Sequence, residues 1–360
     1  MKQINNPEIQ SILNNFIWIN WQNDEKKDDI LKFCALFLNN YPEYHFKTSG
    51  STGTPKLITF TKEQLLISAQ ASISYFELKP GMHQFICLDT NTIAGAMMLV
   101  RSLVCGMIPV ITTPSAIPLY VISEYVTIDV ASFTPNQLYA MLSHIGAHNF
   151  VNKLNQMHTI LIGGAPINPA LERLLESITA PTYHTYGMTE TVSHIALRRL
   201  NGKEKQESFH CMPGVEIKLD ERDCLMLKAP TTMGNWITTN DLAEILSIDQ
   251  FLIKGRYDDI IISGGIKVNP QTIEIIIAQY FIKRNIRNRF FAYGIPDDKL
   301  GQKVVLYLEA SESQFQNELA DLKSYISDSL GKYLVPKEFI FIEKFKETIS
   351  GKIDKIATIW

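Results

Sequence analysis

The segment "DVASFTPNQ", residues 129–137, contains a complete junction between a strand and a helix. Its first five residues are mostly apolar and include a β-branched and an aromatic side chain, which is typical of a buried strand. Thr134, Pro135 and Gln137 then supply, in order, an N-cap, a first-turn proline and a glutamine that can complete a capping box. The segment therefore predicts a strand that leads directly into a helix.

The same arrangement recurs along the first two thirds of the chain. "LITF" is followed by Thr61 and Gln64, which predict a capped helix, and "TILIGG" is followed by Asn168 and Pro169. Buried strands are also predicted at "FICL" and "IPVI", with a helix over residues 95–105 between them. Repeats of this kind predict a largely parallel sheet with helices on both faces. Ligands of such sheets bind beyond the carboxyl ends of the strands.

The pattern changes after about Lys254. A glycine-rich loop is followed by a helix that begins at Asn269 and Pro270, and by strands near "RFFAYGI", "KVVLYLEA" and "EFIFIEKF". A charged amphipathic helix is predicted from Glu312 to Leu330. We therefore expect an α/β protein with a large N-terminal domain, residues 1–255, and a small, mobile α+β domain, residues 256–360, joined by a hinge.

Composition limits the classes of partner. The 360 residues are 46% hydrophobic and 20% charged, which suffices for a sizeable core, and the net charge of −3 argues against a nucleic-acid binder. The longest apolar run, residues 93–110, contains Arg101 and predicts a buried helix and strand instead of a membrane span. The five cysteines have no metal-binding spacing. We expect a cytoplasmic protein with no nucleic-acid or membrane partner.

The segment "KTSGSTGTPK", residues 47–56, indicates a phosphate-binding loop. Glycines let backbone N–H groups surround an anion, and serine and threonine add hydroxyl donors. Lys56 supplies a positive charge. The loop differs from the P-loop of nucleotide triphosphatases, because Lys56 follows proline and precedes leucine. A flexible linker is the alternative interpretation.

Two further segments follow predicted strands. In "YHTYGMTET", residues 183–191, the ring of Tyr186 can stack on a base, hydroxyls can meet phosphate and Glu190 can hold Mg²⁺. In "GGAP", residues 163–166, paired glycines would let a flat ligand lie against the backbone. An ordinary turn is the alternative for both segments.

Three charged residues in the second half of the chain are candidate site residues. Asp241, in "TTND", can accept from both hydroxyls of a ribose, and Arg256 can contact sugar and phosphate. The alternatives are a cap or turn residue for Asp241 and a surface ion pair for Arg256. Lys352, in "ETISGKIDK", could reach across to another domain and neutralise developing charge there. A solvated lysine near the C-terminus is the alternative.

Five segments, in their order along the chain, resemble motifs of the adenylate-forming superfamily of acyl-CoA and aryl-CoA synthetases, peptide-synthetase adenylation domains and luciferases. They are "TSGSTGTPK", "YGMTE", "TTND", "GRYDDIIISGG" (residues 255–265) and "TISGK". The resemblance extends from about Thr48 to Lys355. It implies that ATP and Mg²⁺ are used to join a carboxylic acid to AMP, and that coenzyme A then accepts the acyl group.

The resemblance also implies roles for individual residues. The loop that surrounds the ATP phosphates would comprise Thr48, Ser49, Gly50, Ser51, Thr52, Gly53 and Lys56. The adenine would be framed by Gly164, Ala165, Tyr186 and Gly187. Thr189 would touch the α-phosphate, Glu190 would bind Mg²⁺, and Asp241 with Arg256 would hold the ribose.

The remaining roles belong to the second domain. Asp258 would be the hinge residue, and Lys352 would bridge the substrate carboxylate and the α-phosphate. After domain rotation, Ser263, Gly264 and Gly265 would lie beside the tunnel through which CoA enters.

Within the superfamily, "NTIAGAMMLVRSLVCGMIPV" and "YGMTETVSHIALRRL" are most similar to enzymes that act on o-succinylbenzoate in menaquinone biosynthesis. That acid has a second carboxylate that needs recognition, for which Arg101, Ser193 and His194 are the candidates. Arg101 as a cation on a helix surface is the alternative. Another acyl-CoA or aryl-CoA ligase, an adenylation enzyme that loads a carrier protein, and a non-catalytic nucleotide-binding module are the competing functions.

Most members of the superfamily have a longer region before the phosphate loop. We therefore expect a shortened large domain, for which a second subunit of a homodimer could supply cover.

Overall fold

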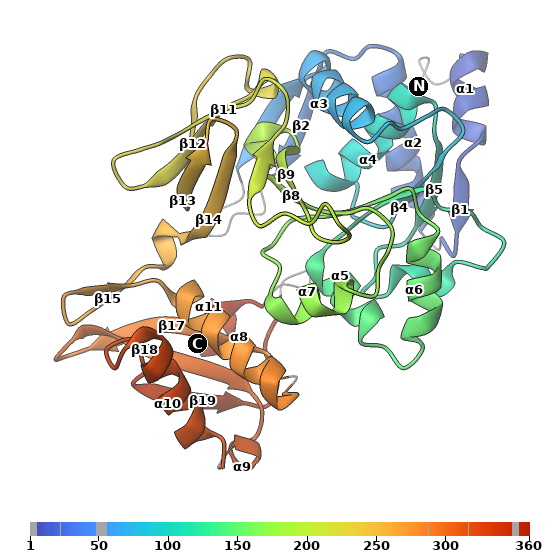
Figure 1. The fold of residues 1–360 in the computed structure, drawn as a ribbon. Helices are drawn as coiled ribbons and strands as arrows, with labels where there is room; N and C mark the ends of the chain where they lie inside the picture. Colours follow the sequence, from blue (N-terminus) through green and yellow to red (C-terminus); the bar gives the residue numbers. More distant parts are fainter. Residues whose placement is uncertain (1–5, 22, 48–55, 287, 316, 348–352) are drawn as a thin grey trace.

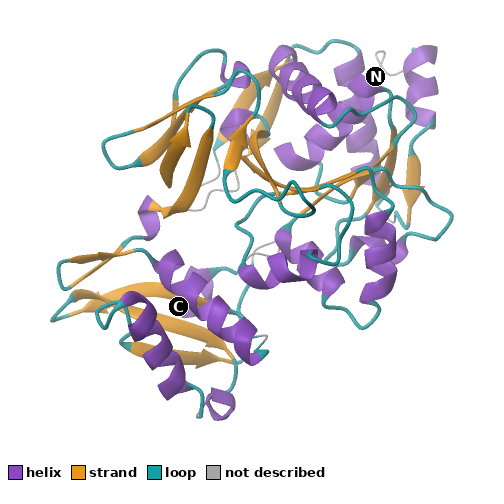
Figure 2. Ribbon diagram, viewed as in Figure 1, coloured by secondary structure: helices purple, strands orange, loops and turns teal. Residues whose placement is uncertain are grey.

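A computed structural model describes residues 6–360 except for residues 22, 48–55, 287, 316 and 348–352. A large sheet with helices on both faces occupies the N-terminal part, and a smaller sheet with its own helices follows Arg256 (Figure 1). Figure 2 shows the two groups of strands with helices packed against them. The predicted fold class is confirmed.

The first half of the large sheet is parallel. Five successive parallel pairs join its six strands. Their order across the sheet is β1 (Ile17–Ile19), β5 (Ile108–Thr112), β4 (His83–Ile86), β6 (Val130–Phe133), β7 (Thr159–Ile162) and β8 (Thr182–Gly187). The strands predicted from "FICL", "IPVI", "DVASF" and "TILIGG" all lie in this half.

The second half of the same sheet is antiparallel, which the sequence pattern did not predict. It continues from β8. The order is β9 (His194–Arg199), β10 (Phe209–Cys211), β14 (Gln250–Arg256), β13 (Ile237–Ser247), β12 (Cys224–Lys228) and β11 (Glu216–Leu219). These strands are joined by turns, loops and short 3₁₀ helices instead of α-helices, so no repeat of strand and α-helix marks them in the sequence.

Helices cover both faces of the parallel half (Figure 1). One face carries α1 (Pro7–Asn14), α2 (Asp24–Leu38), α3 (Lys62–Tyr75) and α4 (Ile93–Cys105), and the other carries α5 (Pro135–Leu142), α6 (Ala147–Asn155) and α7 (Pro169–Leu175). Neighbouring strand residues point to opposite faces. Phe85 therefore joins the core under α5 to α7, whereas Ile86 joins the core under α2 and α4.

The predicted helix starts are confirmed. The Thr61 hydroxyl accepts from the Gln64 N–H in a capping box at the start of α3, and Thr134 and Gln137 form the same box at α5. Asn168 caps α7. Within the described part of the chain, none of the helices combines the length and the apolar character that a bilayer crossing requires.

The strand predicted from "LITF" does not join the parallel sheet. It forms β3 (Leu57–Thr61), which pairs with β2 (Glu43–Lys47) in a separate antiparallel hairpin. Only alternate residues of β2 are buried, so this hairpin covers the helical layer with one face and leaves the other in solvent. Lys47 and Leu57 are direct partners, and the phosphate loop predicted between them therefore starts and ends at the same place.

The C-terminal part has its own sheet. Its strands are β15 (Ile261–Ser263), β16 (Ile266–Val268), β17 (Phe290–Asp297), β18 (Gly301–Glu309) and β19 (Glu338–Ile342). α8 (Pro270–Arg284) and α10 (Leu319–Leu330) share an apolar core with this sheet, and α11 (Lys355–Ile359) ends the chain. α8 also contacts α7 and β14.

The single helix predicted over 312–330 is wrong. The chain forms α9 (Glu312–Phe315) and then α10, with a turn at residues 317–318. The ring of Phe315 packs against Phe281 and Phe341 in the core, so tertiary packing outweighs the continuous helical pattern at this point.

Candidate active site

Tyr186, Asp241 and Arg256 come from three strands and meet in one cluster. The Tyr186 hydroxyl donates to Asp241 Oδ2 at 2.6 Å, and Arg256 Nη1 donates to Asp241 Oδ1 at 3.0 Å. The second contact follows from strand register, because Asp241 of β13 lies directly opposite Arg256 of β14. Both carboxylate oxygens therefore have a donor, and the three predicted nucleotide-binding side chains are brought together.

The ring of Tyr186 is fixed by aromatic neighbours. It lies 5.6 Å from the Phe209 ring and 5.2 Å from the Phe251 ring, centroid to centroid. Burial, and secondly the negative charge of Asp241, raise the pKa of the phenol well above its ordinary value. Tyr186 is therefore a protonated hydrogen-bond donor, and its orientation is held by contacts at both ends of the side chain.

Arg256 also connects the cluster to the predicted hinge. Its Nη2 atom donates to Asp258 Oδ2 at 2.9 Å, and the Asn240 side-chain amide donates to the same oxygen at 3.2 Å. Asp258 lies in the short 3₁₀ helix η4 (Tyr257–Asp259), which follows β14. The ion pair considered as an alternative for Arg256 does form, and its partners are the predicted ribose and hinge carboxylates.

The "GGAP" loop lies against β8. A Cβ atom on Gly163 would come within 2.4 Å of Thr185 Oγ1, and Gly164 has a φ of +85° that favours glycine. The Ala165 carbonyl accepts from His184 Nε2 at 3.2 Å, which assigns the imidazole proton to Nε2. These contacts hold the loop beside the strand that carries Tyr186.

His184 is a residue that the sequence reasoning missed. Burial, together with the charge of Arg198, lowers the pKa of its imidazole to about 3. The ring packs on Phe209 at 4.9 Å. Its position two residues before Tyr186, on the same face of β8, was the signal available in the sequence.

The turn after β8 is tightly constrained. A Cβ atom on Gly187 would lie 2.1 Å from the Ser193 carbonyl oxygen, so only glycine fits there. Thr189 and Glu190 follow in the 3₁₀ helix η2 (Thr189–Thr191). The next residue, Val192, is fully buried with a φ of +69°, a strained conformation for a β-branched side chain.

Glu190 could take part in holding Mg²⁺. It is half-buried, and its carboxylate has neither a hydrogen bond nor an ion pair with the residues that the structure describes. Among these residues, no group of three or more histidine, cysteine, aspartate or glutamate side chains is arranged to bind a metal. Mg²⁺ is commonly bound by one or two carboxylates together with substrate phosphate oxygens. A single carboxylate without a partner among the described residues, on the turn that follows Tyr186, fits that mode of binding.

Arg101 is buried inside the protein. It lies on α4 with 3% of its surface exposed, and its Nε and Nη1 atoms are buried without a hydrogen-bond partner among the described residues. Burial lowers the pKa of the guanidinium to about 10, so it remains charged at neutral pH. The alternative of a helix-surface cation does not describe this residue.

Of the other two acid-recognition candidates, His194 lies near Arg101, and Ser193 precedes it in the sequence. Burial, and secondly the charge of Arg101, lower the pKa of His194 to about 3, so this histidine is neutral. Its Nε2 atom lies 3.0 Å from the hydroxyl of Ser72, which donates to the Ser68 carbonyl. His194 Nε2 is therefore the donor in that contact, and Nδ1 faces the Ser193 hydroxyl at 3.4 Å.

Several predicted site residues lie outside the described residues. These are Thr48, Ser49, Gly50, Ser51, Thr52, Gly53 and Lys352. Lys56 is described and lies exposed immediately before β3.

The predicted CoA-facing residues form a hairpin turn. Ser263 pairs with Ile266, and Gly264 and Gly265 between them both have positive φ angles, of +57° and +83°. Two consecutive positive φ angles are what a tight two-residue hairpin requires. The turn joins β15 to β16 at the edge of the C-terminal sheet.

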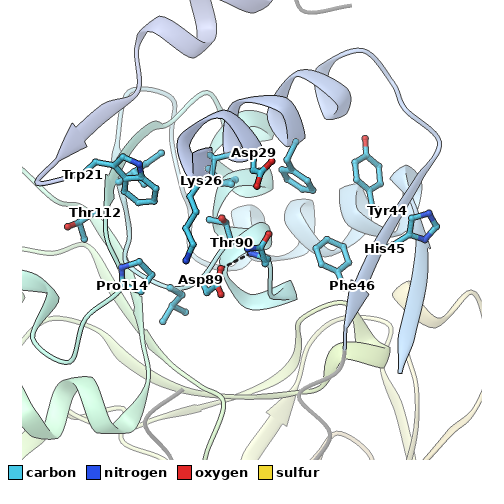
Figure 3. A pocket seen from close by; sticks show the side chains of 16 residues that line it. Trp21, Lys26, Asp29, Tyr44, His45, Phe46, Asp89, Thr90, Thr112 and Pro114 are labelled. Atoms are coloured by element: carbon cyan, nitrogen blue, oxygen red, sulfur yellow. Dashed lines mark hydrogen bonds between the residues drawn. The ribbon is translucent and has the colours of Figure 1, made fainter. Parts of the chain in front are cut away.

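A pocket of about 140 Å³ lies apart from these residues (Figure 3). It is lined by aromatic side chains of α2 and the β2–β3 hairpin, including Phe33 and Phe46, and by the loop before α4. The side chain of Lys26 points toward Asp89 at its rim. None of the predicted site residues lines this pocket.

Two family models match the chain. The model for AMP-binding enzymes matches residues 43–231, and the model for the C-terminal domain of AMP-binding enzymes matches residues 288–352. The chain belongs to the AMP-binding enzyme family. The resemblance to adenylate-forming enzymes is thereby confirmed.

Curated relatives are similar at low identity. A 2-succinylbenzoate–CoA ligase of Listeria monocytogenes is 26% identical over 339 residues, which cover 86% of this chain and 68% of the relative. A 2-succinylbenzoate–CoA ligase of Bacillus cereus is 25% identical over 335 residues, which cover 85% of this chain and 67% of the relative. The chain thus spans about two thirds of the length of these relatives.

Solved structures share the fold. An acyl-CoA synthetase (AMP-forming)/AMP-acid ligase II-like protein from Dyadobacter fermentans is 37% identical, with 94% of this chain and 95% of that chain covered and a TM-score of 0.62. The o-succinylbenzoate coenzyme A synthetase from Bacillus subtilis, solved with ATP and magnesium ion, is 22% identical. The match covers 88% of this chain and 69% of that chain, with a TM-score of 0.70.

Proposed function

We propose that this protein is an AMP-forming acid:CoA ligase, and that its acid is o-succinylbenzoate. The choice of acid rests on one observation: the guanidinium of Arg101 is buried, and two of its nitrogen atoms have no hydrogen-bond partner among the described residues. A buried cation is costly unless an anion pairs with it. The second carboxylate of a dicarboxylic acid would supply that anion when the substrate binds.

The nucleotide would occupy the cluster around Asp241. The ribose hydroxyls would donate to Asp241, the adenine would lie between Tyr186 and the "GGAP" loop, and the phosphates would meet residues 48–56. Glu190 would hold Mg²⁺, which supplies positive charge to the phosphates when bound. The contacts between Tyr186, Asp241 and Arg256 support this arrangement, because they place the three side chains at one site.

The reaction would proceed in two steps. A carboxylate oxygen of the acid attacks the α-phosphorus of ATP. The bond between the α-phosphorus and the oxygen that bridges it to the β-phosphorus breaks, and pyrophosphate leaves with the electron pair. The thiolate sulfur of CoA then attacks the acyl carbon, and AMP leaves with the electron pair of the broken C–O bond. Lys352 would lower the barrier of the first step, in which two anions must approach each other.

We further propose that residues 1–255 and 256–360 are the two domains, with Asp258 as the hinge. The separate sheet and core of the C-terminal part support this division. Ser263, Gly264 and Gly265 would face the entering thiol after rotation, as the resemblance to adenylate-forming enzymes implies.

A second candidate is a ligase for another acid. The relative from Dyadobacter fermentans is more similar in sequence than the o-succinylbenzoate enzymes, and its description names no particular acid. An adenylation enzyme that loads a carrier protein would share the first step. The presence of Lys352, Glu190 and Asp241 argues against a non-catalytic module.

The test is acid-dependent exchange of pyrophosphate into ATP over a panel of acids, followed by product analysis with CoA or a carrier protein as acceptor. We expect o-succinylbenzoate to be preferred over an analogue that lacks the second carboxylate by about 10- to 100-fold in kcat/KM, since hydrogen bonds to a charged group contribute about 1.5–3 kcal/mol. Arg101→Leu should remove this preference and leave the KM for ATP unchanged. Equal use of both acids by the unmodified enzyme would exclude o-succinylbenzoate as the specific substrate.

A further inference from the structure

The two ends of the segment that contains Lys352 meet at one place on the C-terminal sheet. Glu347 and Ile353 form an antiparallel bridge, and the Asp354 N–H donates to the Lys346 carbonyl at 2.8 Å. Lys352 lies outside the described residues and immediately precedes Ile353 in the sequence. Whatever fixes this paired base therefore fixes the two described residues that flank residues 348–352, Glu347 and Ile353.

Arg289 attaches the first strand of the base to the sheet. It lies immediately before β17, and its Nε and Nη2 atoms each donate to one oxygen of Glu309, both at 2.6 Å. The remaining nitrogen, Nη1, donates to Glu347. A guanidinium that pairs with one carboxylate through two parallel bonds has a fixed orientation, so the third bond holds Glu347 in a defined position.

The Arg289–Glu309 pair also contacts Phe345. Glu309 Oε1 also accepts from the Phe345 N–H at 2.7 Å, and the guanidinium lies 5.8 Å from the centre of the Phe345 ring. The bond to Glu309 raises the pKa of Arg289, against the opposing effect of burial. Arg289 therefore stays charged and connects the end of β18 to Phe345 and Glu347.

A second set of contacts attaches the other strand. Ile353 packs against an apolar cluster that includes Phe291 and Phe345. Lys355 Nζ lies 3.4 Å from Glu274 Oε1 on α8, and that oxygen also accepts from the backbone N–H of Ala292. The base is thus connected to β17 on both sides, by the Arg289–Glu347 ion pair and by the contacts after Ile353.

We propose that Arg289 and Glu347 are positioning residues for Lys352 in the adenylation step. The inference rests on the proposed function, in which Lys352 stabilises the attack of the acid on ATP. The ion pair acts in two ways. It holds the base of the lysine segment, and it occupies the carboxylate of Glu347, which is close to Lys352 in sequence and would otherwise attract its ammonium group.

The primary test is Glu347→Gln in the full chain. This change removes one charge and keeps the Arg289–Glu309 pair. We expect adenylation, measured as pyrophosphate exchange, to fall by about 10- to 100-fold, since a displacement of about 1 Å can cost about a hundredfold in rate. Thioester formation from supplied acyl-adenylate should change by less than about threefold.

Two further variants separate positioning from general stability. Arg289→Gln should reduce adenylation more than Glu347→Gln does, because it frees the Glu347 carboxylate, and Arg289→Lys should restore part of the rate. Arg284→Gln is the matched control. Arg284 pairs with Asp321 and Glu318 elsewhere in the C-terminal part, and its loss should leave both half-reactions unchanged.

Hydrogen exchange provides a readout that does not depend on activity. The amide of Asp354 should exchange faster in Glu347→Gln and Arg289→Gln than in the unmodified protein and in Arg284→Gln. If hydrogen exchange at Asp354 is unchanged in these variants, Arg289 and Glu347 do not hold the base of the lysine segment. If a variant loses adenylation and thioester formation equally, the pair has no specific positioning role in adenylation. Absence of acid-dependent pyrophosphate exchange in the unmodified protein would overturn the proposed function itself, whatever the exchange of Asp354 shows.

Discussion

Replacement of Arg101 by methionine should make the free protein more stable. The residue is only 3% exposed, and the pKa of its guanidinium falls from an ordinary value of about 12.5 to about 10. This difference corresponds to about 3 kcal/mol of destabilisation of the charged form. A base with a lowered pKa in the folded state imposes its full cost below that pKa and is relieved only as the pH rises above it, so the cost is fully present at pH 7.

Methionine removes the charge and keeps most of the volume of the side chain. Replacement of buried charges by packed apolar residues can stabilise a protein by about 1–4 kcal/mol. We therefore expect Arg101→Met to raise the urea midpoint of the free protein at pH 7 by an amount equivalent to about 1–3 kcal/mol. In the same variant, o-succinylbenzoate at a fixed concentration should add about 1.4–2.7 kcal/mol less stability than it adds to the unmodified protein, because the loss of the Arg101 contact weakens binding by about 10- to 100-fold.

Arg198→Met is the matched control, since Arg198 lies on β9 directly opposite His184 and pairs with Glu172. Its removal leaves Glu172 without that partner and should lower stability. A loss of stability in Arg101→Met comparable to that in Arg198→Met would refute the reasoning. It would mean that Arg101 is a structural residue whose charge is balanced within the fold, and that no anion from the substrate is needed.

Two other substitutions test the catalytic machinery. Lys352→Ala should slow adenylation by at least a few hundredfold, because lost charge stabilisation of about 3–4 kcal/mol corresponds to that factor, while thioester formation from supplied acyl-adenylate is spared; an adenylation rate within about tenfold of the unmodified enzyme would contradict the role. Gly187→Ala would place a Cβ atom 2.1 Å from the Ser193 carbonyl oxygen, so the turn that carries Glu190 must move. We expect weaker magnesium-dependent ATP binding by calorimetry, and unchanged affinity would argue against a role for this turn.

The parts of the fold that could be predicted from the sequence depend on local geometry. The capping boxes of α3 and α5 involve residues three apart, Thr61 with Gln64 and Thr134 with Gln137, so the sequence contains all of the information they need. The antiparallel half of the sheet was not predicted, because its pairings are set by turns and by contacts between strands that carry no periodic signal.

The site could be predicted only as a set of residue types. The glycines, hydroxyls and carboxylates of the motifs indicated nucleotide chemistry, but the cluster of Tyr186, Asp241 and Arg256 depends on the register between β13 and β14 and on the approach of β8. The burial of Arg101 depends likewise on how α3 packs against α4 and on the approach of His194, so a surface position remained possible from the sequence alone.

The same distinction explains why the Arg289–Glu347 pair was not found. Its members are 58 residues apart, and each alone is an ordinary charged residue near the end of a strand. The positioning role of the pair depends on a third residue, Glu309. Glu309 fixes the orientation of the Arg289 guanidinium, which in turn determines where Glu347 can lie. A charge whose role is to orient a neighbouring segment has no local sequence signature, because the geometry it enforces exists only after the sheet has formed.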